Sequence, residues 1–176
     1  IEVDEGKSAK IEKINIIGNE IFTTEEILRG FELSEGSFFS FLSNDDQYSR
    51  EKLKGDIETL ESYYRDRGYL KFSIESSQIS LSRDKREIYI TFNVNEGQKY
   101  TIKDVEVVGE IPFEEEIYIN ITDSLKEQTY SQATITGIEE FFTNVLGNRG
   151  YAFAEVKGNP EVEDESNEVK LTLDRK

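Results

Sequence analysis

One stretch of the sequence occurs twice, and this repeat restricts the folds open to the chain more than any other feature. VDEGKSAKIEKINIIG at residues 3–18 returns without a gap as VNEGQKYTIKDVEVVG at residues 94–109, an offset of 91 residues (94 − 3). A second block, Arg67-Gly68-Tyr69, returns as Arg149-Gly150-Tyr151 at an offset of 82 (149 − 67). A chain of 176 residues that repeats in this way is predicted to form two small domains.

The first repeat predicts a strand followed by two helices. Ile14 and Ile16 alternate with polar residues and run into Gly18-Asn19, which indicates a strand closed by a turn. Thr23, with Glu26 three residues later, is a capping box for a short helix over about 24–32. Ser49 is the predicted N-cap of a second helix. Its apolar face is formed by Leu53, Ile57, Leu60 and Tyr64, and it ends at Gly68.

Two strands complete the repeat. Residues 70–81 alternate, but their phase slips at Ser76-Ser77-Gln78, which predicts a β-bulge there. A turn at Asp84-Lys85 leads into the alternating strand 88–94. The second repeat has the same order but lacks nine residues of the region SEGSFFSFLSNDDQ, which reads as an insertion in the first repeat.

The predicted fold class is α+β, with two tandem β-α-α-β-β domains. Each is expected to be a three-stranded mixed sheet of order 1-3-2, packed under two antiparallel helices, which leaves the second strand at an edge. The predicted domains are 9–97 and 98–176, and residues 1–8 are expected to be the end of a preceding repeat or a linker.

Composition disfavours several classes of function. Without His or Cys the chain lacks the commonest general base, the thiol nucleophile and most transition-metal ligands, so we expect no enzyme, no metal and no cofactor. A carboxylate-based hydrolase would need two acids converging in one pocket, and no such pair stands out. The net charge of −16 disfavours nucleic acid as a partner.

The strand and helix order, with Gly-Asn after the first strand and Arg-Gly-Tyr before the second, resembles the POTRA (polypeptide-transport-associated) repeats of outer-membrane β-barrel assembly proteins of the BamA family. INIIGNEIFTTEEI, GDIETLESYYRDRGY and SSQISLSRDKREIYITFNVNEG are similar to the third repeat of that family, and GNRGYAFAEVKGNPEVEDE is similar to the fourth. The resemblance covers nearly the whole chain and is weakest at 110–128.

The resemblance implies a non-catalytic, chaperone-like segment on the periplasmic side of the outer membrane of a Gram-negative bacterium. Its implied partners are unfolded outer-membrane β-barrel proteins, a β-propeller lipoprotein, other lipoproteins of the assembly complex, and the protein's own C-terminal membrane barrel. The alternatives are a POTRA segment of a related secretion or translocation transporter, and a passive spacer.

The second strand is the first candidate for the partner surface, because an edge strand can accept an extended peptide through its backbone. In the family's third repeat this strand accepts an added strand and contributes to lipoprotein docking, and Glu75 and Ile79 stand here for the family's Asp and Val. The alternative is an edge protected by Lys71 and the bulge. The candidate residues are Leu70, Phe72, Ile74, Glu75, Ser76, Ser77, Gln78, Ile79 and Leu81.

A second candidate surface is formed by bulky apolar residues in and before the insertion. These are Phe31, Leu33, Phe38, Phe39, Phe41 and the adjacent Leu42. They form either a compact loop that buries its own aromatic side chains or an exposed patch that needs a partner.

Overall fold

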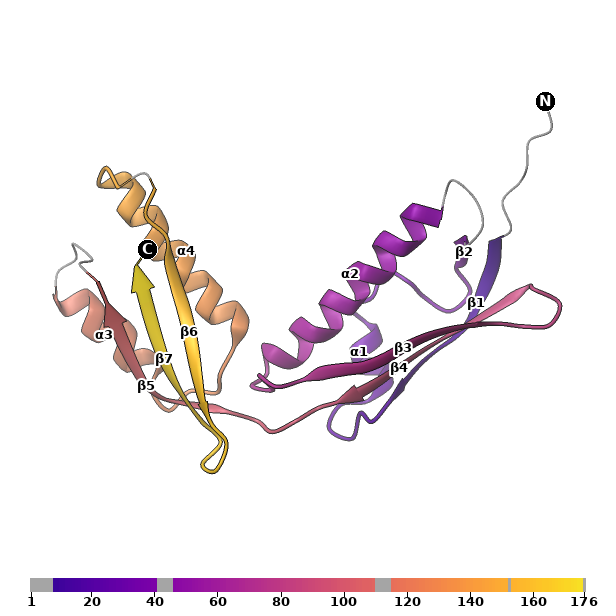
Figure 1. The fold of residues 1–176 in the computed structure, drawn as a ribbon, viewed down its shortest axis with the longest axis horizontal. Coiled ribbons are helices and arrows are strands. Elements are labelled where there is room, and N and C mark those ends of the chain that lie inside the picture. Colours follow the sequence, from indigo (N-terminus) through magenta and orange to yellow (C-terminus); the bar gives the residue numbers. More distant parts are fainter. Residues whose placement is uncertain (1–7, 41–45, 110–114, 152, 176) are drawn as a thin grey trace. The chain divides into compact units, whose positions relative to one another are not determined.

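The computed structural model of the protein describes residues 8–40, 46–109, 115–151 and 153–175 (Figure 1). The chain forms two compact units, and the division between them is not a single cut in the sequence. The first unit comprises Ile1–Tyr63 and Phe72–Gly97, and the second comprises Tyr64–Lys71 and Gln98–Lys176.

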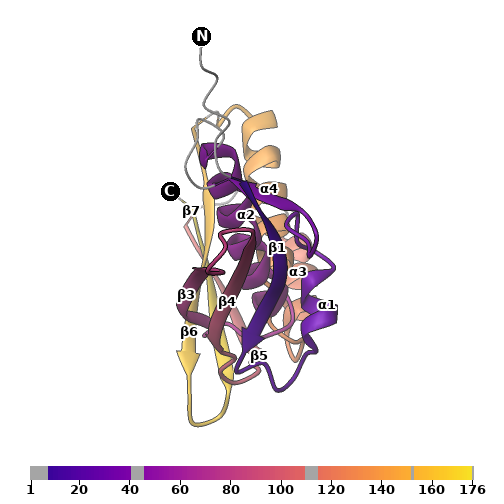
Figure 2. The same ribbon diagram turned by 90° about the vertical axis from the view of Figure 1, so that its right-hand side faces the viewer.

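The first unit contains a four-stranded mixed sheet. Its elements are β1 (Ser8–Ile17), α1 (Thr24–Leu28), β2 (Phe38–Ser40), α2 (Asp46–Arg65), β3 (Ser73–Leu81) and β4 (Glu87–Asn95). The strand order is β2-β1-β4-β3, with β1 and β4 parallel and the other pairs antiparallel. Figure 2 shows β3, β4 and β1 side by side in front of α2. The predicted order of the three main strands is confirmed, but the predicted number of strands is wrong for this unit.

The additional strand, β2, comes from the insertion. Phe38 and Phe39 pair with Lys10 and Ala9 of β1, so β2 adds a strand to the sheet on the side of β1 away from β4. Ser49, predicted as an N-cap, lies inside α2, which begins at Asp46. Its hydroxyl accepts the backbone N–H of Ser40 at 3.1 Å. The side chain expected to cap a helix therefore bonds the end of β2 instead.

Helix α1 begins as predicted and ends earlier. The Thr23 hydroxyl accepts the N–H of Glu26, and the Glu26 carboxylate accepts the N–H of Thr23, which completes the capping box. The helix ends at Leu28, whereas the sequence predicted it to about residue 32. The N–H groups of Glu32 and Leu33 are bonded to the Asp56 carboxylate of α2, which holds this segment out of the helix.

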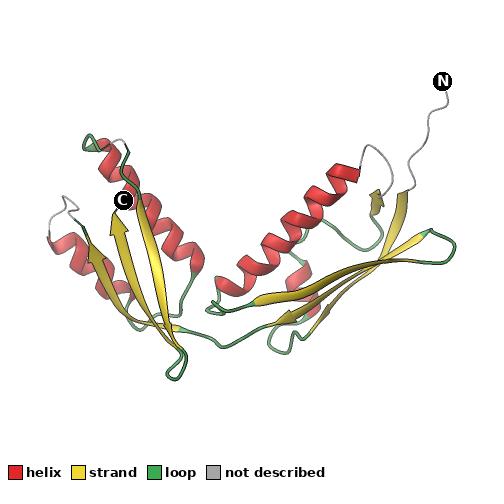
Figure 3. Ribbon diagram, in the orientation of Figure 1, coloured by secondary structure: helices red, strands yellow, loops and turns green. Residues whose placement is uncertain are grey.

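The second unit contains the predicted three-stranded mixed sheet. Its elements are β5 (Thr101–Val108), α3 (Glu115–Leu125), α4 (Gln132–Asn148), β6 (Val156–Glu163) and β7 (Glu168–Arg175). The order is β5-β7-β6, with β5 and β7 parallel, and α4 passes behind β6 and β7 (Figure 3). Ser131 caps α4 by accepting the N–H of Thr134.

Each unit has its own core, in which the sheet packs against the helices. The first includes the buried side chains of Ile11, Ile14, Ile27, Leu60, Ile88, Ile90 and Phe92. The second includes Ile102, Tyr130, Ile135, Phe142, Leu146, Val169, Leu171 and Leu173. In both units the parallel pair shifts register at the same repeat position, between Ile11 and Lys13 and between Ile102 and Asp104. No helix within the described ranges is long and apolar enough to cross a membrane.

Gly18 ends β1 in a conformation that only glycine adopts easily. Its φ is +95°, and a Cβ atom there would lie 2.3 Å from the carbonyl oxygen of Val94. We expect Gly18→Ala to lower the free energy of unfolding of the first unit by about 2–3 kcal/mol, since backbone strain and a clash with main-chain atoms add up. Urea denaturation followed by circular dichroism measures this loss.

Gly55 provides the matched control, because it lies in α2 and a Cβ atom added there would meet no other atom within 4 Å. Gly55→Ala is expected to stabilise the unit by about 0.5–1 kcal/mol through helix propensity. Equal effects of the two substitutions would contradict the role given to Gly18.

Candidate functional site

Strand β3 lies at the edge of the first sheet, at the end of the row formed by β1, β4 and β3 (Figure 2). It begins at Ser73, three residues later than predicted, because residues 70 and 71 form a turn and residue 72 precedes the ladder. Its partner is β4 alone, through an antiparallel ladder. The other side of β3 carries no strand among the described residues.

The hydrogen-bonding pattern identifies which residues of β3 point away from the sheet. Ser82 donates its N–H to Glu87, and in an antiparallel ladder bonded and non-bonded residues alternate along the strand. Ser77, Ile79 and Leu81 therefore direct their N–H and C=O groups outward. No described residue bonds any of these N–H groups, so this part of the edge is open to an added strand.

The side chains of the same residues lie on the helix side of the sheet. Ile79 faces the buried Ile90 of β4, and Leu81 faces the buried Ile88. Nevertheless Ile79 is 48% exposed and Leu81 is 38% exposed, so the helices leave this end of the sheet uncovered. Open backbone groups and accessible apolar side chains coincide at the same two residues.

The other candidate residues of the predicted strand lie either ahead of β3 or elsewhere within it. Phe72 is buried ahead of the strand, and Leu70 packs against the core of the second unit. The bulge lies between Ile74 and Ser76, one residue before the predicted slip, and leaves Glu75 as the extra residue. The Ser76 hydroxyl accepts an N–H from the side chain of Asn93, and Gln78 is exposed.

The residues of the second candidate surface differ in how far they are buried. Leu33 and Phe39 are buried, and Phe31 is half-buried, with its ring edge-to-face on Phe92 at 6.1 Å between centroids. Phe38, next to Phe39 in β2, is 72% exposed because neighbouring residues of a strand point to opposite faces. Phe41 lies outside the described residues, as does Leu42.

Asp56 connects α2 to this region. It is 1% exposed, and its two oxygens accept the N–H groups of Glu32 at 2.7 Å and Leu33 at 2.9 Å. Burial raises the pKa of the Asp56 carboxyl above its ordinary value, although the two N–H donors act in the opposite direction. The carboxylate thus has a structural task, because its acceptor capacity is used by the backbone of a loop.

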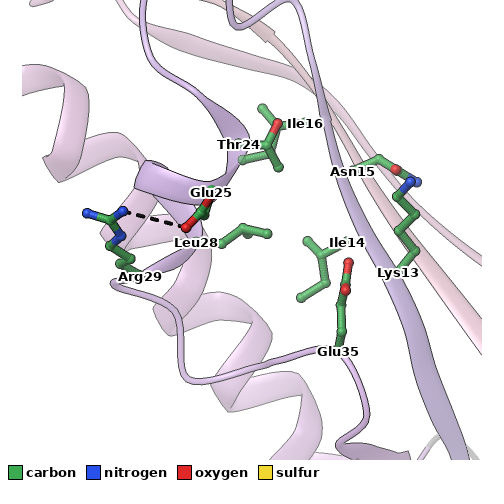
Figure 4. Close-up of a pocket in the computed structure, with 9 residues that line it drawn as sticks. All are labelled: Lys13, Ile14, Asn15, Ile16, Thr24, Glu25, Leu28, Arg29 and Glu35. Atoms are coloured by element: carbon green, nitrogen blue, oxygen red, sulfur yellow. Dashed lines mark ion pairs between the residues drawn. The ribbon is translucent and has the colours of Figure 1, made fainter.

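A pocket of about 570 Å³ lies between β1 and α1 in the first unit (Figure 4). Glu25 and Arg29 form an exposed ion pair of 3.6 Å at its rim, and the Thr24 hydroxyl accepts a bond from the Asn19 side chain. No nucleophile and base meet among these side chains. The lining residues are Lys13, Ile14, Asn15, Ile16, Thr24, Glu25, Leu28, Arg29 and Glu35.

Sequence reasoning did not identify the residues that occupy the backbone of the edge strand in the second unit. In the second unit β6 is the edge strand that corresponds to β3, and α4 contributes two side chains that bond its backbone. One signal was present in the sequence, since Pro160 within a strand is typical of an edge without a donor at that position. The α4 contacts have no such signal, because they depend on how closely the helix packs on the strand.

Comparison with known proteins assigns the fold to a family. The POTRA family, described as a surface antigen variable number repeat, matches residues 9–97 and 100–174. The chain therefore belongs to the POTRA family and consists of two POTRA repeats, and this segment is non-catalytic.

Within that family, the relatives are outer-membrane protein assembly factors. Over 98% of its length the chain is 28% identical to BamA of Neisseria meningitidis and 28% identical to BamA of Buchnera aphidicola. It spans only 22% and 28% of the lengths of these two relatives. POTRA repeats 3–5 of Haemophilus influenzae BamA have the same fold, with a TM-score of 0.81 at 24% identity over 96% of this chain and 66% of that one.

The Asp56 contacts predict a dependence of stability on pH. Asp56→Asn retains one acceptor and leaves one loop N–H unbonded, so we expect a loss of about 1–3 kcal/mol at neutral pH. Because the pKa of Asp56 is raised on folding, the folded protein holds more protons than the unfolded one just above pH 3.8. The contribution of the Asp56 carboxyl to the free energy of unfolding therefore decreases as the pH rises through this range.

The difference in unfolding free energy between the two proteins should accordingly be largest at the acid end of a urea series from about pH 3 to about pH 7. A carbon-13 titration of the Asp56 carboxyl reports its pKa directly. A midpoint below that of an unfolded aspartate would refute the assignment.

Proposed function

We propose that the chain is a periplasmic segment of an outer-membrane protein assembly factor that binds extended segments of unfolded outer-membrane β-barrel proteins. The observation that carries the proposal is the open edge of β3, where Ser77, Ile79 and Leu81 direct outward N–H groups that no described residue bonds. Membership of the POTRA family and similarity to the assembly factor BamA support the setting.

The chemistry of this surface suits clients of many sequences. An added strand pairs through its backbone, which every residue supplies, while the accessible side chains of Ile79 and Leu81 favour apolar residues on one face. Strands destined for a membrane barrel alternate apolar and polar residues, so one face of each matches this preference.

The expected affinity is low. Three outward residues offer at most about six backbone bonds, each contributing about 0.5–1.5 kcal/mol net, against about 4–15 kcal/mol lost in translational and rotational freedom. Burial of Ile79 and Leu81 adds only part of their side-chain area. A client bound in this way is released readily, as delivery to another site requires.

The same strand is the proposed docking site for accessory lipoproteins, including one with a β-propeller. Glu75 projects from the bulge beside the open edge, and Gln78 and Ile79 are exposed on opposite faces of the strand. Client and lipoprotein would therefore compete for one edge. The protein's own membrane barrel completes the proposed set of partners.

A proline tests whether the β3 backbone binds clients. Ile79→Pro removes the outward N–H at the centre of the open edge, at a position that donates no bond to β4. We expect the fold to persist and the binding of a synthetic nine-residue strand peptide, alternating Phe and Thr, to weaken at least tenfold. In the full-length parent, outer-membrane protein levels should fall in parallel.

Ile79→Ala is the matched control, because it truncates the side chain and retains the backbone donor. It should weaken binding less than Ile79→Pro does. If the proline variant folds, binds peptide as the unsubstituted chain does and supports normal outer-membrane protein levels, β3 is a passive part of a spacer and the proposal is wrong.

A further inference from the structure

The two units can be compared residue by residue through their sheets. In the first, Ile14 of β1 pairs with Ile90 of β4. Val105 follows Ile14 by 91 residues (105 − 14), the repeat offset, and pairs with Leu171 of β7. Ile90 and Leu171 therefore occupy equivalent places in the two sheets.

The edge strands differ at the residues opposite these two. Ile90 faces Ile79 on β3, whereas Leu171 faces Pro160 on β6. The position that carries an outward N–H at the centre of the β3 edge is thus held in β6 by a residue that has none.

At the outward position that precedes Pro160 in β6, the backbone N–H is bonded by a side chain of α4. Gly158 is the β6 residue that corresponds to Ser77, since it faces Leu173 where Ser77 faces Phe92. Its N–H donates to Oε1 of Glu139 on α4 at 2.6 Å. In α2 the residue at the repeat position of Glu139, 82 residues earlier, is Ile57, whose side chain has no acceptor.

The first outward position of β6 is occupied in the same way. The N–H of Val156 donates to the hydroxyl of Thr143, one turn further along α4, at 3.1 Å. Val162, near the end of the strand, is the one remaining outward position within β6, and no described residue bonds its N–H. Two outward donors are therefore bonded, one is missing and one is left.

The close approach of α4 depends on Gly158. A Cβ atom at this residue would lie 2.6 Å from Cγ2 of Ile135, which points from α4 toward the strand. The absence of a side chain lets the helix pack close enough for Glu139 to reach the backbone of β6. Figure 1 shows α4 running behind this strand.

We infer that α4 closes β6 against strand addition, with Glu139 and Thr143 taking the places that carbonyl groups of an added strand would occupy. This closure is a property of the second unit by itself. Together with the proposed function, on which this second statement rests, it leaves β3 as the open member of the two corresponding edge strands and makes Glu139 a residue that determines which of these two strands binds an extended peptide.

Hydrogen exchange tests the closure without any ligand. In Glu139→Ala the amide of Gly158 should exchange at least tenfold faster than in the unsubstituted chain, as measured by nuclear magnetic resonance. Glu139→Gln retains the acceptor oxygen and should remain within about threefold of the unsubstituted rate. Unchanged exchange in Glu139→Ala, with the fold intact, would overturn the assignment of Glu139.

The binding of a peptide tests whether strand addition occurs at β3 and is prevented at β6. The probe is the nine-residue Phe-Thr peptide, and the variant combines Glu139→Ala, Thr143→Val and Pro160→Ile. In the unsubstituted chain we expect peptide-induced amide protection at residues 77, 79 and 81 alone, and in the variant additional protection at 156, 158 and 160. If Thr143→Val impairs folding, the variant with the other two substitutions carries the same test.

The outcomes separate this inference from the proposed function. Protection of β6 in the unsubstituted chain, or its absence in the folded variant, would overturn the closure. Binding to β6 in the variant without binding to β3 in either protein would uphold the closure and refute the proposed function. Binding to β3 in both and to β6 in the variant alone supports both.

Discussion

The parallel pairing of the first and last strands is the constraint on which the rest of each unit depends. β1 pairs with β4, and β5 with β7, in the same direction, so the chain between them must cross over and cannot be a tight turn. The crossover contains the helices, which cover one face of the sheet. The middle strand is joined to the last by a hairpin and takes its other side, so an edge strand is built into the topology.

On this shared topology, the two units differ in whether the backbone of the edge strand is open or occupied by side chains of the neighbouring helix. The first presents Ile79 where the second has Pro160, and Ile57 where the second has Glu139. These are single-residue differences on a shared backbone arrangement. Under the proposed function, the side chains along one edge and on the helix beside it determine which repeat binds an extended peptide, and the fold alone does not reveal this.

Much of this architecture could be predicted from local sequence patterns. The strand order, the parallel pair and the capping box at Thr23 follow from alternation, helix periodicity and one side-chain motif. β2 could not be predicted, because its three residues become a strand only through pairing with β1, and Asp56 shortens α1 through bonds across 24 and 23 residues of sequence. The open edge at β3 was likewise predictable, whereas closure of β6 depends on the packing of a helix against a strand.

The short strand β2 affects how copies of the molecule can associate. It covers the start of the outer edge of β1, where Ile11 also bonds the backbone of Gly36 and Ser37, so an added strand cannot pair with this part of β1. A second copy that pairs edge to edge through β3 therefore cannot extend the sheet through this part of β1. Continuous zippering into fibrils needs two open edges on each copy, and β2 removes part of one of them.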